Sequence, residues 1–292
     1  MSTSVISEHL ALPAAGEPRT YTVHTRTEIR VPGHQFIQTS TALLRLTVLQ
    51  ADPTGALLEV ATLALRPDAP TPQVALLTAI ACQQTPLHVR TDAQGTPLHI
   101  TNKAALATQW QQVLPELLAH YGAQPGAAAL LALVAPQYDE TNDQLAQGLM
   151  HQGAGAVLLP DFYGLHSWQG DTRTVPKTVR QALGPVALPL HVSWTAAPAD
   201  VFAPAAEVEG IGRLDRATFD EGASQAFLAS LRGEVWTGPP APLNVFWRAQ
   251  YTVGRRGQGL LAGRQGLRVA VDKLYFADIS HVVRPATSLP PA

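Results

Sequence analysis

The sequence predicts an α+β protein built on a strongly curved, mainly antiparallel β-sheet, half-barrel-like, with interposed helices. Long segments near both ends of the chain alternate between apolar and polar residues, as strands with one buried face do. The first three such segments follow one another through short turns, which is typical of an antiparallel meander. Segments with helical spacing separate the strand groups, and this order suits a sheet that wraps around helices.

Length, composition and charge narrow the class of protein. The 292 residues suit one large domain or two ordinary ones, and 46% hydrophobic residues can form a large core. The formal net charge of −2 gives no support for binding to nucleic acid. Cys82 is the only cysteine, so the chain forms no internal disulfide and no cysteine-rich zinc site. We see neither a signal peptide nor an apolar run of about 18 residues, and we therefore expect a cytoplasmic protein without a membrane span.

The first elements after a flexible N-terminal arm, residues 1–19, are predicted to be strands. The turn from Asp52 to Gly55 joins two of them, because proline presets φ for a turn and glycine accepts a positive φ. A helix with apolar residues at helical spacing follows the third strand. The predicted ranges are 21–31, 40–50 and 56–66 for the strands and 71–84 for the helix.

The segment 86–102 predicts a β-hairpin with two possible registers. A three-residue loop would pair Asp92 with Thr96, whereas a four-residue loop would place His88 directly opposite His99. We favour the four-residue loop, because it keeps the apolar side chains of both strands on one face.

The two facing imidazoles, of His88 and His99, could share a metal ion. A metal site needs further ligands, and the sequence places no carboxylate nearby at a suitable spacing. We therefore expect no metal and no other cofactor, and this pair stays only as a candidate.

A helical insert is predicted over about 102–152. Asn102 can cap the helix that follows it, and Pro115 predicts a kink or a division within that helix. Two further helices are predicted around 127–134 and 140–151, from their apolar spacing.

The C-terminal part returns to strands separated by a helix. We predict a long loop with a short strand and a short helix at 153–185, strands at 186–194 and 205–215, a helix at 216–233, and strands at 242–253 and 266–283. Residues 285–292 are predicted to form a disordered tail. We expect a single domain over 20–284, whose element order suggests two similar halves, 20–152 and 153–284. The architecture is similar to the half-barrels of lipoprotein carriers in fold alone, and because no motif is shared, no function follows from it.

The loop at 151–168 combines residue types that occur in acyl transfer. Asp161, His166 and Ser167 could supply an orienting carboxylate, a base and a nucleophile. The surrounding residues lack the Gly-x-Ser-x-Gly elbow that exposes such a nucleophile. We therefore expect no enzymatic activity, and a hydrolase-like enzyme stays as an alternative.

Large aromatic residues recur in the loop at 151–168 and on the strands predicted after it. Such side chains usually fill a core, but in an open half-barrel they would line a cavity for an apolar ligand. The candidate ligand-binding residues are Tyr163, Trp168, Trp194, Trp247 and Tyr251.

Four arginines stand among five glycines in the segment 253–268, which predicts a mobile connection between two long strands. Glycine-rich backbone together with arginine can bind an anion. The spacing matches neither a P-loop nor a dinucleotide fingerprint, so the signal is unspecific. The candidate anion-binding residues are Arg255, Arg256, Arg264 and Arg268.

These features together predict a non-enzymatic binding or assembly protein. Its curved sheet would present a surface or groove to a protein partner or a small apolar ligand. The prediction depends on long amphipathic strands, few charges and the lack of a catalytic motif. A structural subunit of a larger complex is a further alternative.

Overall fold

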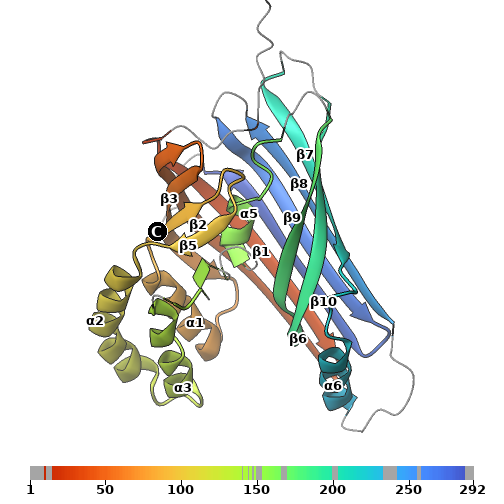
Figure 1. Ribbon diagram of the computed structural model, residues 1–292. Helices are drawn as coiled ribbons and strands as arrows, with labels where there is room; N and C mark the ends of the chain where they lie inside the picture. Colours follow the sequence, from red (N-terminus) through yellow and green to blue (C-terminus); the bar gives the residue numbers. More distant parts are fainter. Residues whose placement is uncertain are drawn as a thin grey trace, which may run out of the picture. The chain divides into compact units, whose positions relative to one another are not determined.

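The computed structural model describes residues 10, 15–139, 141–143, 145–146, 148, 153–165, 170–198, 203–232, 242–254 and 258–286. Most of the strands belong to one large antiparallel sheet that is not closed. Its strand order is β5-β4-β3-β2-β1-β10-β9-β8-β7-β6 (Figure 1). The predicted combination of a large antiparallel sheet with helices is therefore confirmed.

The chain packs as two compact units. Unit 1 comprises Met1–Ala14, Arg26–Ile37 and Pro160–Val282, and unit 2 comprises Ala15–Thr25, Gln38–Leu159 and Val283–Ala292. The predicted halves, 20–152 and 153–284, stay a prediction. Of the predicted arm at 1–19, Leu10 is buried and its backbone bonds to Gly164 and Leu165.

The first strands form the predicted meander. They are β1 (Arg19–Val31), β2 (His34–Asp52) and β3 (Gly55–Pro67). Asp52 pairs with Gly55 across the predicted turn. Gly55 has a φ of 150°, and a Cβ there would lie 1.9 Å from the carbonyl oxygen of Thr91. Only glycine therefore fits at this corner.

The hairpin of β4 (Leu87–Thr91) and β5 (Pro97–Ile100) corrects the predicted register. The amide of Asp92 bonds to the carbonyl of Thr96, which is the three-residue loop. A bulge then shifts the pairing, so that Arg90 rather than His88 lies opposite His99. The bulge still allows an apolar pair to form across the hairpin, because it places Val89 opposite Ile100. Leu98 is left 51% exposed.

The helices of unit 2 follow the prediction closely. They are α1 (Pro72–Gln83), α2 (Lys103–Tyr121), α3 (Ala127–Ala132), the short 3₁₀ helix η1 (Ala135–Tyr138) and α5 (Gly153–Leu158). Of the two alternatives predicted at Pro115, the division is wrong, because α2 runs through this residue, and the kink stays a prediction. Asn102 precedes α2 as predicted, but its side chain bonds to the backbone of Pro86 and His88 instead of capping the helix. Half of the predicted helix at 140–151 lies outside the described residues.

The strand β6 (Thr172–Ala196) replaces part of the predicted long loop and folds back on itself. The amide of Ala196 bonds to the carbonyl of Asp171, and the hydroxyls of Thr174 and Ser193 lie 3.0 Å apart. The segment is therefore a hairpin with a first arm, 172–180, and a second arm, 185–196. With the arms taken separately, the sheet has eleven strands.

The remaining elements of unit 1 are β7 (Ala205–Leu214), α6 (Glu221–Arg232), β8 (Leu243–Gly254), β9 (Gly259–Val271) and β10 (Tyr275–Pro285). The predicted single strand at 266–283 is wrong, since a turn at Asp272, with a φ of 44°, divides it. The predicted mobile connection at 253–268 is wrong for most of its length, since β9 begins at Gly259.

The sheet of unit 1 curls. The hydroxyl of Tyr275 on β10 donates to the carbonyl of Ala182 in the β6 turn over 3.0 Å, although β9, β8 and β7 separate these strands in the sheet. Adjacent strands lie about 4.8 Å apart, so in a flat sheet the two groups would be far out of reach. Phe227 of α6 packs on Tyr275, with ring centroids 5.7 Å apart. A Cβ at Gly184 would meet the Phe227 ring at 2.4 Å.

The inner face of unit 1 is the side of its sheet that carries Trp194, Trp247 and Tyr251, and the outer face is the opposite side. Trp194 and Trp247 need two glycines on the strand between them. A Cβ on Gly210 would lie 2.4 Å from the Trp194 ring, and one on Gly212 would lie 2.9 Å from the Trp247 side chain. The alternating glycines of β7 therefore mark the places where tryptophans cross the strand.

The substitution Gly210→Ala is expected to destabilise the protein by about 1–3 kcal/mol, because the added methyl group meets the Trp194 ring. Urea unfolding measures the loss. The matched control is Gly266→Ala on β9, where a Cβ finds its nearest neighbour, the carbonyl of Ile279, at 4.0 Å. This control should be neutral or slightly stabilising. Equal effects at the two positions would contradict the proposed packing.

Candidate functional site

The aromatic candidates gather in one buried cluster on the inner face of unit 1. Tyr163, Trp194, Trp247 and Tyr251 are each at most 2% exposed. The centroid of the Trp194 ring lies 5.6 Å from that of the Trp247 ring and 5.9 Å from that of the Tyr251 ring. Phe162 joins them at 5.3 Å from Trp194. These rings fill space between one another, and the fifth candidate, Trp168, lies outside the described residues.

Asp161 anchors this cluster rather than facing a cleft. It is 7% exposed, and its Oδ1 accepts a hydrogen bond from Nε1 of Trp194 over 2.8 Å. Burial, followed by the charges of Asp161 and Tyr163, raises the pKa of Tyr251 well above its usual value. The other two hydrolase candidates, His166 and Ser167, lie outside the described residues, so the hydrolase alternative stays a prediction.

Beside the cluster, four apolar side chains of the inner face are only partly covered. We call them the inner-face strip. Their neighbours on the same face of the same strands are mostly buried, as Lys177, Trp247, Ala277 and His281 show. The strip consists of Ile29, Val175, Val245 and Ile279.

The strand registers and one ion pair place two members of the strip, Val245 and Ile279, near Trp247 on one face. Trp247 lies opposite Leu267 and next to Val245 along the same face. The ion pair of Arg268 with Asp278 places β9 beside β10, so that Leu267 neighbours Ile279. Apolar side chains from separate strands therefore lie in adjoining rows of one inner face.

A buried lysine stands at the edge of this strip. Lys177, on the first arm of β6, is 6% exposed. Its Nζ lies 5.9 Å from the centre of the Trp247 ring. Nε1 of Trp247 is buried and has no hydrogen-bond acceptor within the described part of the chain. The site thus combines an apolar strip with one lysine at its edge, whereas the indole N–H of Trp247 is enclosed by the protein.

Sequence reasoning missed Lys177 and Val175, because 172–185 was predicted to be mostly loop. A signal was present in the alternation of this arm. Thr172 and Thr174 share one side, whereas Val175, Lys177 and Val179 share the other. Pro176 weakened that signal, since proline is rare within sheets.

The described members of the predicted anion site are engaged in contacts across strands of the outer face. Nε of Arg264 donates to Oε1 of Gln250 over 2.7 Å. Arg268 forms an ion pair with Asp278 at 2.7 Å. Arg255 and Arg256 lie outside the described residues, so anion binding by this segment stays a prediction.

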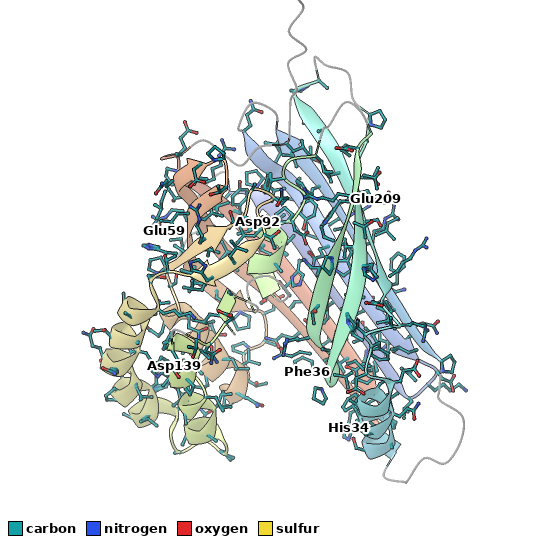
Figure 2. The ribbon with its side chains drawn as sticks, in the orientation of Figure 1. His34, Phe36, Glu59, Asp92, Asp139 and Glu209 are labelled. Atoms are coloured by element: carbon teal, nitrogen blue, oxygen red, sulfur yellow. The ribbon has the colours of Figure 1, made fainter. Side chains whose placement is uncertain are left out.

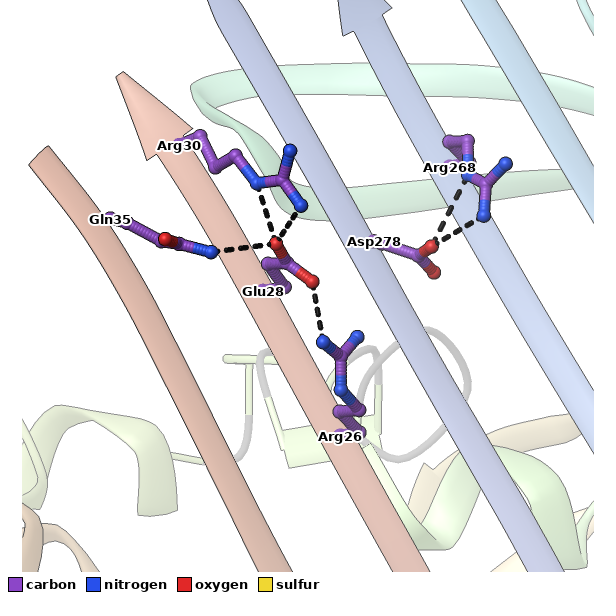
Figure 3. Close-up of polar contacts among 6 residues, drawn as sticks. All are labelled: Arg26, Glu28, Arg30, Gln35, Arg268 and Asp278. Carbon is purple, nitrogen blue, oxygen red and sulfur yellow. Dashed lines mark hydrogen bonds and ion pairs between the residues drawn. The ribbon is translucent and has the colours of Figure 1, made fainter. Parts of the chain in front are cut away.

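A second outer-face cluster surrounds Glu28, which is only 4% exposed (Figure 3). Arg26, Arg30 and Gln35 all donate hydrogen bonds to its carboxylate. The hydrogen bonds from Arg26 and Arg30 lower the pKa of Glu28. The Arg30 guanidinium also stacks on Phe276, 4.8 Å from the ring centre. The pattern Arg-x-Glu-x-Arg on one strand face is the sequence signal for this cluster.

The outer face also holds a hollow of about 300 Å³ over the second arm of β6 and β7. Glu209, labelled in Figure 2, is part of its lining and pairs with Arg248. His191 lies 3.3 Å from Asp215 at one side of the hollow. The lining residues are His191, Ser193, Thr195, Glu209, Ile211 and Arg213.

The predicted metal pair is not assembled. His88 lies across from Glu59 on β3, with Nε2 3.7 Å from Oε2, while His99 lies opposite Arg90. Within the described ranges, no group of three or more histidine, cysteine, aspartate or glutamate side chains is placed to hold a metal ion. None of the described helices combines the length and apolar character needed to cross a membrane.

Comparisons with known proteins find solved structures of low sequence identity. No family model and no curated protein sequence matches the chain. A structure titled for lipid–protein interactions in lipovitellin is 9% identical, and the match covers 96% of this chain but 26% of the lipovitellin chain, with a TM-score of 0.44. An outer membrane channel from Pseudomonas putida F1 is 11% identical, with coverage of 98% and 100% and a TM-score of 0.16. The Pseudomonas aeruginosa complex of MucA and MucB gives 11% identity, coverage of 91% and 89%, and a TM-score of 0.13. TM-scores below 0.5 do not establish a shared fold.

Proposed function

We propose that this chain is a non-enzymatic binding protein that holds a small apolar or amphipathic molecule against the inner face of unit 1. The inner-face strip is the observation that carries the proposal. Ile29, Val175, Val245 and Ile279 face the buried side of the sheet, yet each keeps some exposure. A ligand that covers them gains about 25 cal/mol for each Å² of apolar surface removed from water.

The surroundings of the strip resemble those of small-molecule sites. Such sites are mostly apolar and carry a small number of polar groups that orient the ligand. The strip provides the apolar surface, and Lys177 provides a polar group at its edge. The aromatic cluster forms a rigid wall next to it, because its rings are packed against one another.

Calorimetric titration with 1-decanol tests the proposal. The variant Val175→Trp fills the strip and is expected to weaken decanol binding at least about tenfold. The control variant, Thr174→Trp, adds the same side chain to the outer face of the same arm and should leave binding unchanged. Binding that is absent from the native protein, or equal in both variants, would refute the proposal.

A protein partner is the second candidate, and the outer-face hollow favours it. Ile211 and Phe246, which are 43% and 56% exposed, lie on that face of β7 and β8. Apolar residues among Arg213 and Arg248 fit the composition of protein interfaces. A photo-crosslinking amino acid at position 211 should yield one defined adduct in the native cell, and the same probe at position 273 should not.

A further inference from the structure

We propose that the outer face of unit 1 docks an acidic segment of another protein, whose carboxylates pair with the arginines around the exposed ring of Phe246. This inference rests on the second candidate of the proposed function, a protein partner, and narrows that partner to one class of charge. It follows from three features of the described residues: the row of side chains around Phe246, the hollow beside this row, and the excess of positive charge on this face.

The first feature is a row of side chains that crosses three strands of the outer face. Phe246 of β8 lies opposite Arg268 of β9. On the other side of β8, the pairing of Gly212 with Trp247 sets the residues next to this pair, Arg213 and Phe246, side by side. The Phe246 side chain, which is 56% exposed, therefore has an arginine on each side. Aromatic residues and arginine are the types that are enriched in protein interfaces.

The second feature is the hollow of about 300 Å³ beside this row. Arg213 is part of its lining, and within the described part of the chain no ion pair or hydrogen bond engages the Arg213 guanidinium. Glu209 also lines the hollow, but its carboxylate is already paired with Arg248. Ile211, which is 43% exposed, adds an apolar side chain. The hollow can thus receive a side chain that ends in a carboxylate, because a guanidinium binds a carboxylate with two parallel hydrogen bonds.

The third feature is an excess of positive charge on this face, although the whole chain has a formal net charge of −2. Arg264 donates to the neutral amide of Gln250, so no carboxylate offsets its charge there. An acidic segment is attracted to such a surface, and the attraction speeds its encounter with the protein. The charged residues of β7, β8 and β9 are Arg213, Arg248, Arg264 and Arg268 against Glu207 and Glu209.

The same charges favour an acidic protein over two other occupants of this face. A second copy of the chain, docked by the same surface, would bring two positively charged faces together. An anionic bilayer would present a broad negative surface to the arginines and to Glu207 and Glu209 alike. A peptide segment can place its carboxylates at the arginines alone, and one of its side chains can enter the hollow.

Photo-crosslinking at different salt concentrations tests this inference. A photoreactive amino acid at position 211 is activated in an extract of the native cell, and the linked peptide is sequenced by mass spectrometry. We expect the linked peptide to carry a net negative charge. We expect the yield of the adduct to fall at least about tenfold between about 0.05 and about 0.5 M sodium chloride, because salt screens the charges of exposed groups.

Charge reversal at one arginine provides the matched variants. Arg213→Glu should lower the adduct yield at least about tenfold, and Arg213→Lys should keep part of it. The control Lys273→Glu makes the same change in net charge in the exposed turn between β9 and β10, and it should leave the yield unchanged. The linked sequence and the salt dependence need only the native side chain at position 213, so a folding defect in Arg213→Glu cannot obscure the result.

The outcomes separate this inference from the protein-partner function on which it rests. A linked peptide that is neutral or basic, or that comes from a second copy of this chain, would refute the acidic segment and leave a protein partner standing. An equal yield in Arg213→Glu and in the protein with Arg213 would refute the acidic segment as well. A lack of any protein adduct, or an adduct with lipid alone, would refute the protein partner itself.

Discussion

Replacement of Trp247 by alanine is expected to lower the free energy of unfolding by about 3–5 kcal/mol. The side chain is fully buried and packs against the Trp194 ring, with the two ring centroids 5.6 Å apart. It also packs against the backbone of Gly212 and the Lys177 side chain. Because three strands meet at this ring, its removal leaves a cavity that the sheet cannot easily close. Urea unfolding followed by circular dichroism at a backbone wavelength measures the loss without depending on tryptophan fluorescence.

The matched control for this prediction is Phe246→Ala, one residue earlier on β8. Phe246 points to the outer face and is 56% exposed, so its truncation should change stability by no more than about 0.5 kcal/mol. A large loss in Phe246→Ala together with a small loss in Trp247→Ala would mean that the two faces of β8 are assigned in reverse.

The protein is expected to lose about 3 kcal/mol of stability as the pH falls from about 6.5 to about 4, because of His281. Burial lowers the pKa of this side chain on β10 from 6.5 to about 4. The unfolded chain therefore takes up a proton at a higher pH than the folded protein does. The stabilising contribution of the neutral imidazole is complete above pH 6.5 and is lost progressively as the pH approaches 4.

Urea unfolding at pH 7, 5.5 and 4.5 tests this dependence. The variant His281→Leu should show a flatter profile over this range, whatever its stability at pH 7. The control His34→Leu replaces a histidine at an exposed position of β2 and leaves His281 in place, so the slope caused by His281 should remain. Asp52, whose pKa is lowered to about 2 by its bonds to Thr54 and Arg90, responds only below its usual pKa of 3.8. A native-like slope in His281→Leu would contradict the assignment.

The sequence predicted most strands and helices correctly because local signals agreed with burial. The turn at Asp52 to Gly55 has the chemistry that a hairpin requires, and the register places it as expected. The wrong predictions concern segments whose structure depends on packing against residues far away in the sequence. The bulge at the β4–β5 hairpin is one case, since it appears only when Val89 must face Ile100. The first arm of β6 is another, because Pro176 weakens the strand pattern although the arm lies at a sheet edge.

The candidate site was predictable only in part. The clustering of Trp194, Trp247 and Tyr251 follows from their alternation on strands, but their mutual packing depends on Gly210 and Gly212 of a third strand. The neighbourhood of Lys177 and Trp247 requires the curl of the sheet in unit 1, and no spacing along the chain encodes it directly. Local periodicity predicts which face a residue occupies, not which distant residue it meets.

Proline occurs on both terminal strands of the open sheet. Pro176 lies within the first β6 arm at one end of the strand order, and Pro97 begins the short β5 at the other. A strand from another molecule needs a row of free N–H and C=O groups to pair with, and proline interrupts that row because it has no N–H. The sheet can thus stay unclosed without acting as a template for polymerisation of the chain.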